Sequence, residues 1–128
     1  MAVAYSENLL DHFSHPRNVG ELDEPDGEAS ITNPACGDLM RLQIRVRDDV
    51  IEEAKWRAEG CSTSIAASSV TSELITGRSV EEAAKLSRVQ VTEALGGLPP
   101  AKTHSAVLVT DAVKAAVADY VVKRSRAA

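Results

Sequence analysis

The stretch MRLQIRVRDDVIEEAKWRAEG, residues 40–60, decides the fold class. Apolar and polar side chains alternate over residues 40–47, and small or aromatic residues alternate with charged ones over residues 53–59. Alternation with a period of two predicts β-strands that bury one face. Asp48 and Asp49 separate the two runs and are typical turn residues. The stretch therefore predicts an antiparallel hairpin.

Upstream of this hairpin, one helix and one weaker strand are expected. Residues 6–15 place Leu9, Leu10 and Phe13 on one helical face, and the segment His-Pro-Arg-Asn-Val-Gly that begins at His15 ends this helix. Residues 28–32 form a weaker candidate for a third strand.

Downstream of Gly60 the apolar spacing becomes helical. The first helix there has an apolar face of Ile65, Ala66, Val70 and Leu74. Ser79 followed by Glu82 predicts a capping box for a second, short helix. After a Gly-Gly-Leu-Pro-Pro breaker at 96–100, the last helix is expected from about His104 to Arg124. The order of elements predicts an α+β fold, a three-stranded antiparallel sheet with helices packed on one face.

Composition narrows the possible functions. The chain has 128 residues, so a single domain over residues 1–128 is expected. The net charge of −5 argues against nucleic acid as the main ligand, because binding phosphates requires clustered Lys and Arg.

No apolar stretch approaches the roughly 20 residues that span a bilayer, and no secretory signal is visible. A cytoplasmic location is therefore expected.

Four potential metal ligands lie at element junctions: Cys36, Asp38, Cys61 and His104. A spacing of two in an extended turn can bring Cys36 and Asp38 to the same side, and Gly37 between them permits unusual backbone angles and close approach of a ligand. Cys61 opens a helix, where a thiolate is stabilised, and the thiolate is the form that binds metal.

Each of these residues also has a plainer explanation. A lone cysteine is more often a small buried apolar residue, a lone histidine a surface residue, and Asp38 a turn residue. The spacing alone does not resemble the paired cysteines of a structural zinc site. From the residues themselves, both interpretations stay open.

Several motifs, in the same order along the chain, resemble those of IscU/NifU-type iron–sulfur scaffold proteins. They are Tyr5-Ser6-Glu7, Asp11-His12-Phe13, His15-Pro16-Arg17-Asn18-Val19-Gly20, Asn33-Pro34-Ala35-Cys36-Gly37-Asp38, Glu59-Gly60-Cys61 with the following 62–69, Leu98-Pro99-Pro100-Ala101-Lys102-Thr103-His104, and 111–120. The resemblance covers nearly the whole chain. The short spacing between Cys61 and His104 resembles the IscU-like branch.

This resemblance implies a particular function and site. It implies an IscU/SufE-like fold and a scaffold, not an enzyme, that assembles and transfers a [2Fe-2S] cluster. Cys36, Asp38, Cys61 and His104 would bind the cluster, or a Zn or Fe ion in the cluster-free form. The implied partners are a cysteine desulfurase, DnaK/DnaJ-type chaperones that dock on Leu98–Lys102, acceptor apoproteins and a frataxin-like protein.

The chain departs from the family pattern directly after the expected ligand histidine. The family has a third cysteine there, whereas this chain has Ser105. In the family this cysteine is a cluster ligand and a proposed sulfur acceptor. A serine hydroxyl is a poor ligand for iron and cannot form a persulfide, so both of these roles are in doubt for Ser105. Two alternatives therefore remain: a zinc-containing sulfur acceptor of the SufU-like kind, or a scaffold-like regulator that no longer assembles clusters. Ala101 also replaces the usual valine of the chaperone motif.

Overall fold

A computed structural model describes residues 5–127. The elements follow in the order α1 (Glu7–Ser14), β1 (Gly27–Thr32), β2 (Leu39–Arg47), β3 (Val50–Glu59), α2 (Ser62–Ile75), α3 (Val80–Ala84), α4 (Arg88–Ala94), the 3-10 turn η1 (Pro100–Lys102) and α5 (His104–Ala127). Within this part of the chain no helix is long and apolar enough to cross a membrane.

The three strands form one antiparallel sheet in the order β1-β2-β3, which confirms the predicted sheet. Asp48 and Asp49, the two residues between β2 and β3, have φ angles of 53° and 60°. Positive φ at both positions is the pattern of a type I′ turn, whose twist matches that of the adjoining strands. The weaker candidate strand, residues 28–32, is real and pairs along β2 as an edge strand.

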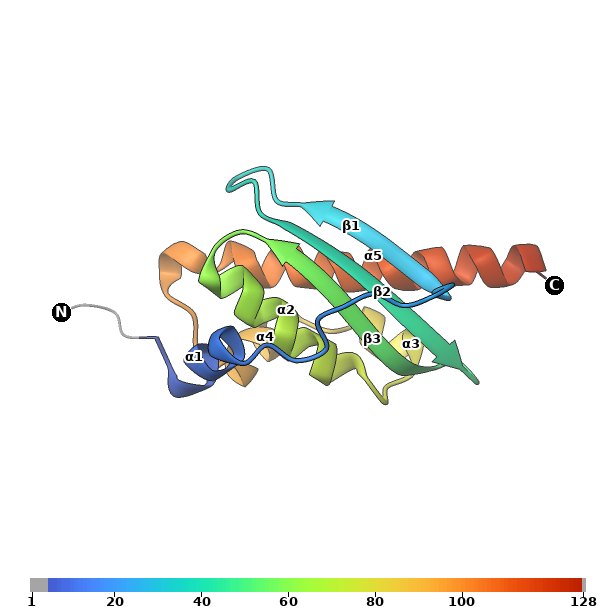
Figure 1. Cartoon of the computed structure of the whole chain (residues 1–128), viewed down its shortest axis with the longest axis horizontal. Helices are drawn as coiled ribbons and strands as arrows, with labels where there is room; N and C mark the ends of the chain where they lie inside the picture. Colours follow the sequence, from blue (N-terminus) through green and yellow to red (C-terminus); the bar gives the residue numbers. More distant parts are fainter. Residues whose placement is uncertain (1–4, 128) are drawn as a thin grey trace.

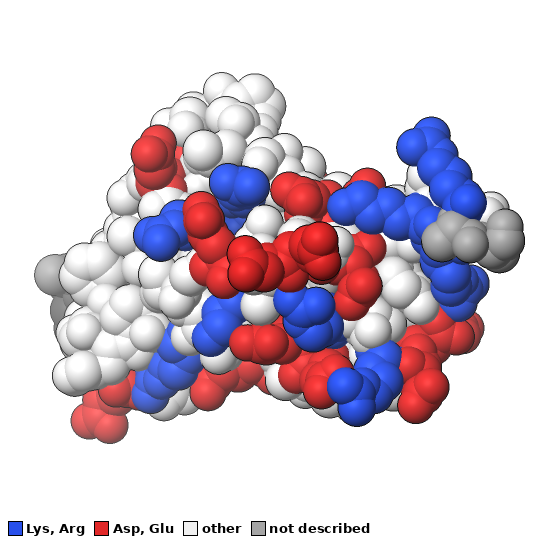
Figure 2. Space-filling model, turned by 45° about the vertical axis from the view of Figure 1, so that its right-hand side comes forward, with Lys and Arg blue, Asp and Glu red and all other residues white. Residues whose placement is uncertain are grey.

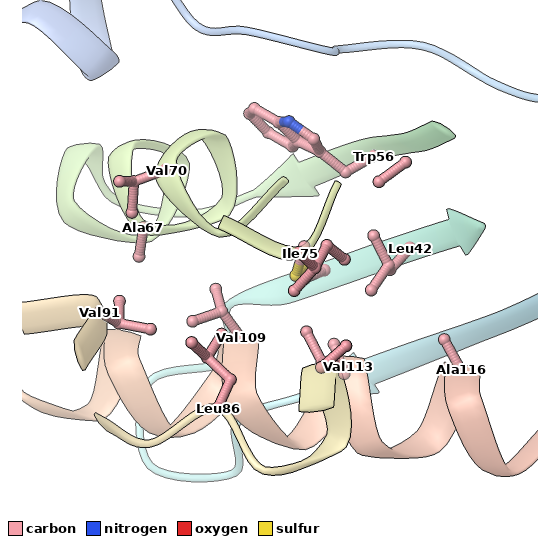
Figure 3. Close-up of a cluster of buried hydrophobic side chains, with 14 of the residues drawn as sticks. Leu42, Trp56, Ala67, Val70, Ile75, Leu86, Val91, Val109, Val113 and Ala116 are labelled. Carbon is pink, nitrogen blue, oxygen red and sulfur yellow. The ribbon is translucent and has the colours of Figure 1, made fainter. Parts of the chain in front are cut away.

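Helices cover one face of the sheet. Met40, Leu42 and Ile44 of β2 point to this face and are fully buried, while α2 packs on β3 and α5 packs on β1 and β2. Figure 1 shows α5 running the length of the molecule behind the sheet and extending beyond it toward the C-terminus. In Figure 3, Leu42 and Ile75 lie between the sheet and helix side chains such as Val109 and Val113.

The opposite face of the sheet is polar, because the residues between the buried ones point outward. Arg41 pairs with Glu21 and Glu28, and Arg45 pairs with Glu53. Figure 2 shows acidic and basic side chains interleaved over the middle of the molecule, whereas the end near the N-terminus is largely uncharged in this view. Exposed ion pairs of this kind add little stability each.

Trp56 is the one aromatic residue of the buried core among the described residues. Its indole Nε1–H donates to the backbone carbonyl of Arg17 at 2.7 Å, and its own backbone exchanges hydrogen bonds with Asn18 and Gly20. The segment before β1 is therefore held against the outer edge of β3. Otherwise the core is aliphatic apart from Met40, in keeping with an aromatic content of only 3% in the sequence.

Three local predictions need correction. Leu9 is buried with His12, whereas Leu10 and Phe13 are exposed, because α1 contacts α2 on only one side. Ser79 caps the backbone N–H of Glu82, but the reciprocal capping box belongs to the next helix and joins Ser87 and Gln90.

The third correction concerns the face of α2. Ile65 and Leu74 are only half-buried, and most of the buried side chains of this helix carry hydroxyls. This helix lies between α1, β3 and α5, so it buries small hydroxyl side chains as well as apolar ones on more than one of its sides.

Candidate metal centre

Three chain segments meet at one end of the molecule: the β1–β2 loop, the β3–α2 junction and the start of α5. Strands β1 and β2 form a hairpin, so their loop returns to the end at which β3 stops and α2 begins. Figure 1 shows the start of α5 at the same end. The four residues expected as ligands lie on these three segments.

The structure brings Cys36, Asp38 and His104 together. One donor atom from each, a thiol sulfur, a carboxylate oxygen and a ring nitrogen, lies within 4.8 Å of the other two. Among the described residues this is the one group of His, Cys, Asp and Glu side chains spaced for a metal ion.

Hydrogen bonds inside the β1–β2 loop set this arrangement. The backbone N–H of Gly37 donates to the carbonyl of Asn33, and the N–H of Asn33 donates to the carbonyl of Asp38. Gly37 has a φ of 76°, which a glycine adopts at little cost. The Asn33 side chain donates to the backbone carbonyl of His104 at 3.3 Å, so it ties the loop to α5.

The imidazole of His104 has an unused nitrogen. Its Nε2 atom is buried and has no hydrogen-bond partner. A buried polar atom without a partner costs free energy, so such atoms are rare unless a ligand satisfies them. This nitrogen therefore supports a metal ion as the ligand of the site.

Cys61 joins the group through Asp38. Its sulfur lies 3.1 Å from Asp38 Oδ2, and its backbone N–H also donates to that oxygen. It is not part of the 4.8 Å group that contains Cys36 and His104. A Cβ atom on Gly60 would lie 2.3 Å from the Asp38 carboxyl carbon, so glycine is required for the close approach of these two segments.

Hydrogen bonds lower the pKa of two acidic groups of the site, Asp38 and Cys61. Burial by itself would raise the pKa of the Asp38 carboxyl, but hydrogen bonds from Ser64 and Cys61 hold this pKa below its ordinary value. Burial also acts to raise the pKa of the Cys61 thiol, but hydrogen bonds from Thr63 and Ser64 lower it overall. The lowered pKa expected for the Cys61 thiol is confirmed, and hydrogen bonds from Thr63 and Ser64 lower it.

Ser105 lies behind these groups and is fully buried. Its hydroxyl is 2.9 Å from that of Thr63 and 3.2 Å from that of Ser64. Thr63 and Ser64 were not predicted from the sequence as residues of the site. The available signal was a run of three hydroxyl residues directly after Cys61, which reads equally well as an ordinary helix start.

These observations define a class of protein: a small α+β domain with a group of thiol, carboxylate and imidazole side chains that fits a metal ion at one end. Comparison with known proteins supports this class of protein. The sequence pattern described as "NifU-like N terminal domain" matches residues 4–127. The chain belongs to this NifU-like N-terminal domain family.

Individual relatives are similar over nearly their full length. The chain is 49% identical over 122 residues to the iron–sulfur cluster assembly scaffold protein IscU of Azotobacter vinelandii, a match that covers 92% of this chain and 94% of that protein. It is 48% identical over 126 residues to IscU of Haemophilus influenzae, covering 95% and 99%. A crystal structure of a NifU-like protein from Brucella abortus has the same fold, with a TM-score of 0.74 at 21% identity, covering 92% and 94%.

Proposed function

We propose that this chain is a scaffold on which an iron–sulfur cluster is assembled and from which the cluster is passed on. The observation that carries the proposal is the grouping of Cys36, Asp38 and His104 around a buried ring nitrogen that has no partner. The names of the full-length relatives support it, because they are iron–sulfur cluster assembly scaffold proteins. A regulator that has lost assembly, or a SufU-like sulfur acceptor, is not favoured.

The proposed ligands are Cys36, Asp38, Cys61 and His104. Four donors match the terminal positions of a [2Fe-2S] cluster or the shell of one tetrahedral ion. Iron enters as cargo, and Zn or Fe occupies the site before the cluster forms. Only two of the donors are thiolates, so we expect the cluster to be held less tightly than by four cysteines, which suits transfer.

The proposed partners follow from this role. A cysteine desulfurase supplies sulfur, acceptor apoproteins take the cluster, and a frataxin-like protein takes part in assembly. DnaK/DnaJ-type chaperones dock on Leu98–Lys102, a segment of exposed and half-buried residues that ends two positions before His104. We propose that residues 1–128 act as one domain, in the cytoplasm and without turnover chemistry of their own.

Anaerobic reconstitution tests the function. The protein is incubated with Fe²⁺, a cysteine desulfurase and cysteine, and the product is followed by visible absorption and Mössbauer spectroscopy. We expect a [2Fe-2S] spectrum and transfer of the cluster to an apo-ferredoxin. His104→Ala should form little cluster, whereas the control His15→Ala, which changes an exposed histidine at the C-terminal end of α1, should behave like the original. Absence of a cluster in the unmodified protein, or equal yields from both variants, would overturn the proposal.

A further inference from the structure

A buried group of three hydroxyls underlies the metal centre. Thr63, Ser64 and Ser105 each have no exposed surface, and their hydroxyl oxygens are joined through Ser105 at 2.9 and 3.2 Å. Two of these hydroxyls also contact proposed metal ligands. The Thr63 hydroxyl lies 3.0 Å from the Cys61 sulfur, and the Ser64 hydroxyl donates to Asp38 Oδ2 at 2.6 Å. This hydroxyl cluster therefore contacts two of the four proposed ligands.

The number of available protons determines how the hydroxyl cluster can bond. Each hydroxyl has one proton to donate and can accept two hydrogen bonds. Ser64 uses its proton on Asp38. If the thiolate of Cys61 is to receive a hydrogen bond from Thr63, then Thr63 must accept from its other neighbour, Ser105. The proton of Ser105 then goes to Thr63 and the proton of Thr63 goes to Cys61, while the longer 3.2 Å contact between Ser105 and Ser64 has no proton of its own.

Ser105 is not placed to bind a metal itself. Its hydroxyl is separated from the Cys61 sulfur by the hydroxyl of Thr63, and its side chain is fully enclosed. Its position favours a different role, because groups that hydrogen-bond to a metal ligand fix the orientation of that ligand and raise metal affinity.

We propose that Ser105 is a positioning residue, which acts through Thr63 to hold the Cys61 sulfur beside Asp38 and present it to the metal. This inference rests on the proposed function, since it assigns a task within the same site. Ser105 thus stands where the family pattern has a third thiol. It supports one of the two thiols that remain, that of Cys61. Ser64 does the same for Asp38.

Co²⁺ binding to the metal-free protein tests this proposal, because sulfur-to-cobalt charge-transfer absorption reports thiolate ligation directly. Ser105→Ala and Thr63→Val should each weaken Co²⁺ binding by about 10- to 100-fold and lower the charge-transfer intensity per bound ion. Ser105→Thr keeps the hydroxyl and should restore both values. Ser68→Ala is the matched control, since Ser68 is equally buried on α2 but bonds only to the backbone carbonyl of Ser64.

Two double variants show whether Ser105 acts through its neighbours. Thr63→Val combined with Ser105→Ala should bind Co²⁺ no more weakly than Thr63→Val alone, because residues in one network are not additive. In a Cys61→Ser background, Ser105→Ala should have no further effect. Additive losses in either pair, or a Ser105→Ala protein that binds Co²⁺ like the original, would overturn the proposal.

The test separates this inference from the proposed function, because Co²⁺ binding requires neither iron nor sulfide. Circular dichroism and the melting temperature of the metal-free variants check that each has folded. If Ser105→Ala fails to fold, Thr63→Val with its Cys61→Ser background decides the question. Normal cluster assembly together with unchanged Co²⁺ binding in the folded variants would refute the role of Ser105 alone.

Discussion

Asp38 connects the two parts of the candidate site, since it contacts Cys61 and Ser64 and belongs to the group with Cys36 and His104. Among the four proposed ligands, its carboxylate is the one oxygen donor beside sulfur and nitrogen donors. Iron in a sulfide cluster favours thiolate, so an oxygen ligand is the most readily exchanged.

We expect Asp38→Ala to lengthen the lifetime of a reconstituted cluster, because the exchangeable ligand that assists release is gone. The measurement is the half-time of transfer to an apo-ferredoxin. Asp119→Ala is the control, since Asp119 caps the backbone N–H of Glu28 away from the site. A shorter lifetime in Asp38→Ala would contradict a role of the carboxylate in release.

Gly60 offers a second test at the residue scale. Gly60→Ala should displace the Asp38 carboxylate, because the added Cβ would lie 2.3 Å from its carbon, and Gly60 also has a φ of 150°. We expect loss of about 1–3 kcal/mol in stability and clearly weaker Zn²⁺ binding by calorimetry. Gly77→Ala is the matched control: its φ is also positive, at 89°, no atom lies within 4 Å of the new Cβ, and it follows the end of α2 that is remote from Cys61. Equal Zn²⁺ affinities would show that the clash is unimportant.

At the scale of elements, α1 is attached to α2 through a buried histidine. The Nδ1 atom of His12 is 2.7 Å from the Ser69 hydroxyl. Burial, and then the charge of Arg17, lower the pKa of this imidazole below 6.5, although Glu73 acts in the opposite direction. The folded protein therefore favours neutral His12.

This attachment predicts a loss of stability on mild acidification. The unfolded chain binds a proton on His12 more readily than the folded protein does, so stability falls as the pH drops below about 6.5 and through the lower folded pKa. Denaturant unfolding at pH 7.5 and 5.5 should show a smaller pH effect in His12→Gln than in the original. The hydrogen bond from Arg17 holds the pKa of the Asp11 carboxyl below its ordinary value, so Asp11 stays charged over this pH range. An identical pH effect in both proteins would exclude His12 as the cause.

The contact between β1 and α5 gives a second prediction for elements. A Cβ on Gly27 would lie 2.4 Å from the backbone carbonyl of Ala116 and 3.0 Å from the Tyr120 side chain. Gly27→Ala should therefore push the strand from the helix and destabilise the fold by about 1–3 kcal/mol. Ser30→Ala, at an exposed position of the same strand, should leave the melting temperature nearly unchanged. Similar melting temperatures for both variants would show that α5 shifts freely.

At the scale of the whole molecule, metal binding should couple to stability. The proposed ligands come from the β1–β2 loop, the β3–α2 junction and the start of α5, so one ion would link the sheet to both long helices. A ligand that binds only the folded state stabilises it by about 2.7 kcal/mol at a hundredfold excess over its Kd. Zn²⁺ should raise the melting temperature of the original protein but not that of His104→Ala. An unchanged midpoint with binding confirmed by calorimetry would argue against this coupling.

Much of the fold could be predicted because its signals are local. The alternation from Met40 to Arg47 and the Asp48-Asp49 turn depend on neighbours along the chain, and the structure confirms both. The exposed Phe13 could not be predicted, because apolar spacing indicates a helical face but not how much of that face another element covers. The buried hydroxyls of α2 were missed for the same reason.

The sequence by itself determined the α+β class, the family and four residues able to bind a metal. Those inferences need only periodicity, residue chemistry and the order of motifs. The tertiary structure alone decided that Cys36, Asp38 and His104 form one group, that Cys61 reaches this group through Asp38, and that Ser105 lies behind it. The physical reason is distance: Asp38 and His104 are brought together by the packing of α5 on the sheet, and no local pattern encodes that contact.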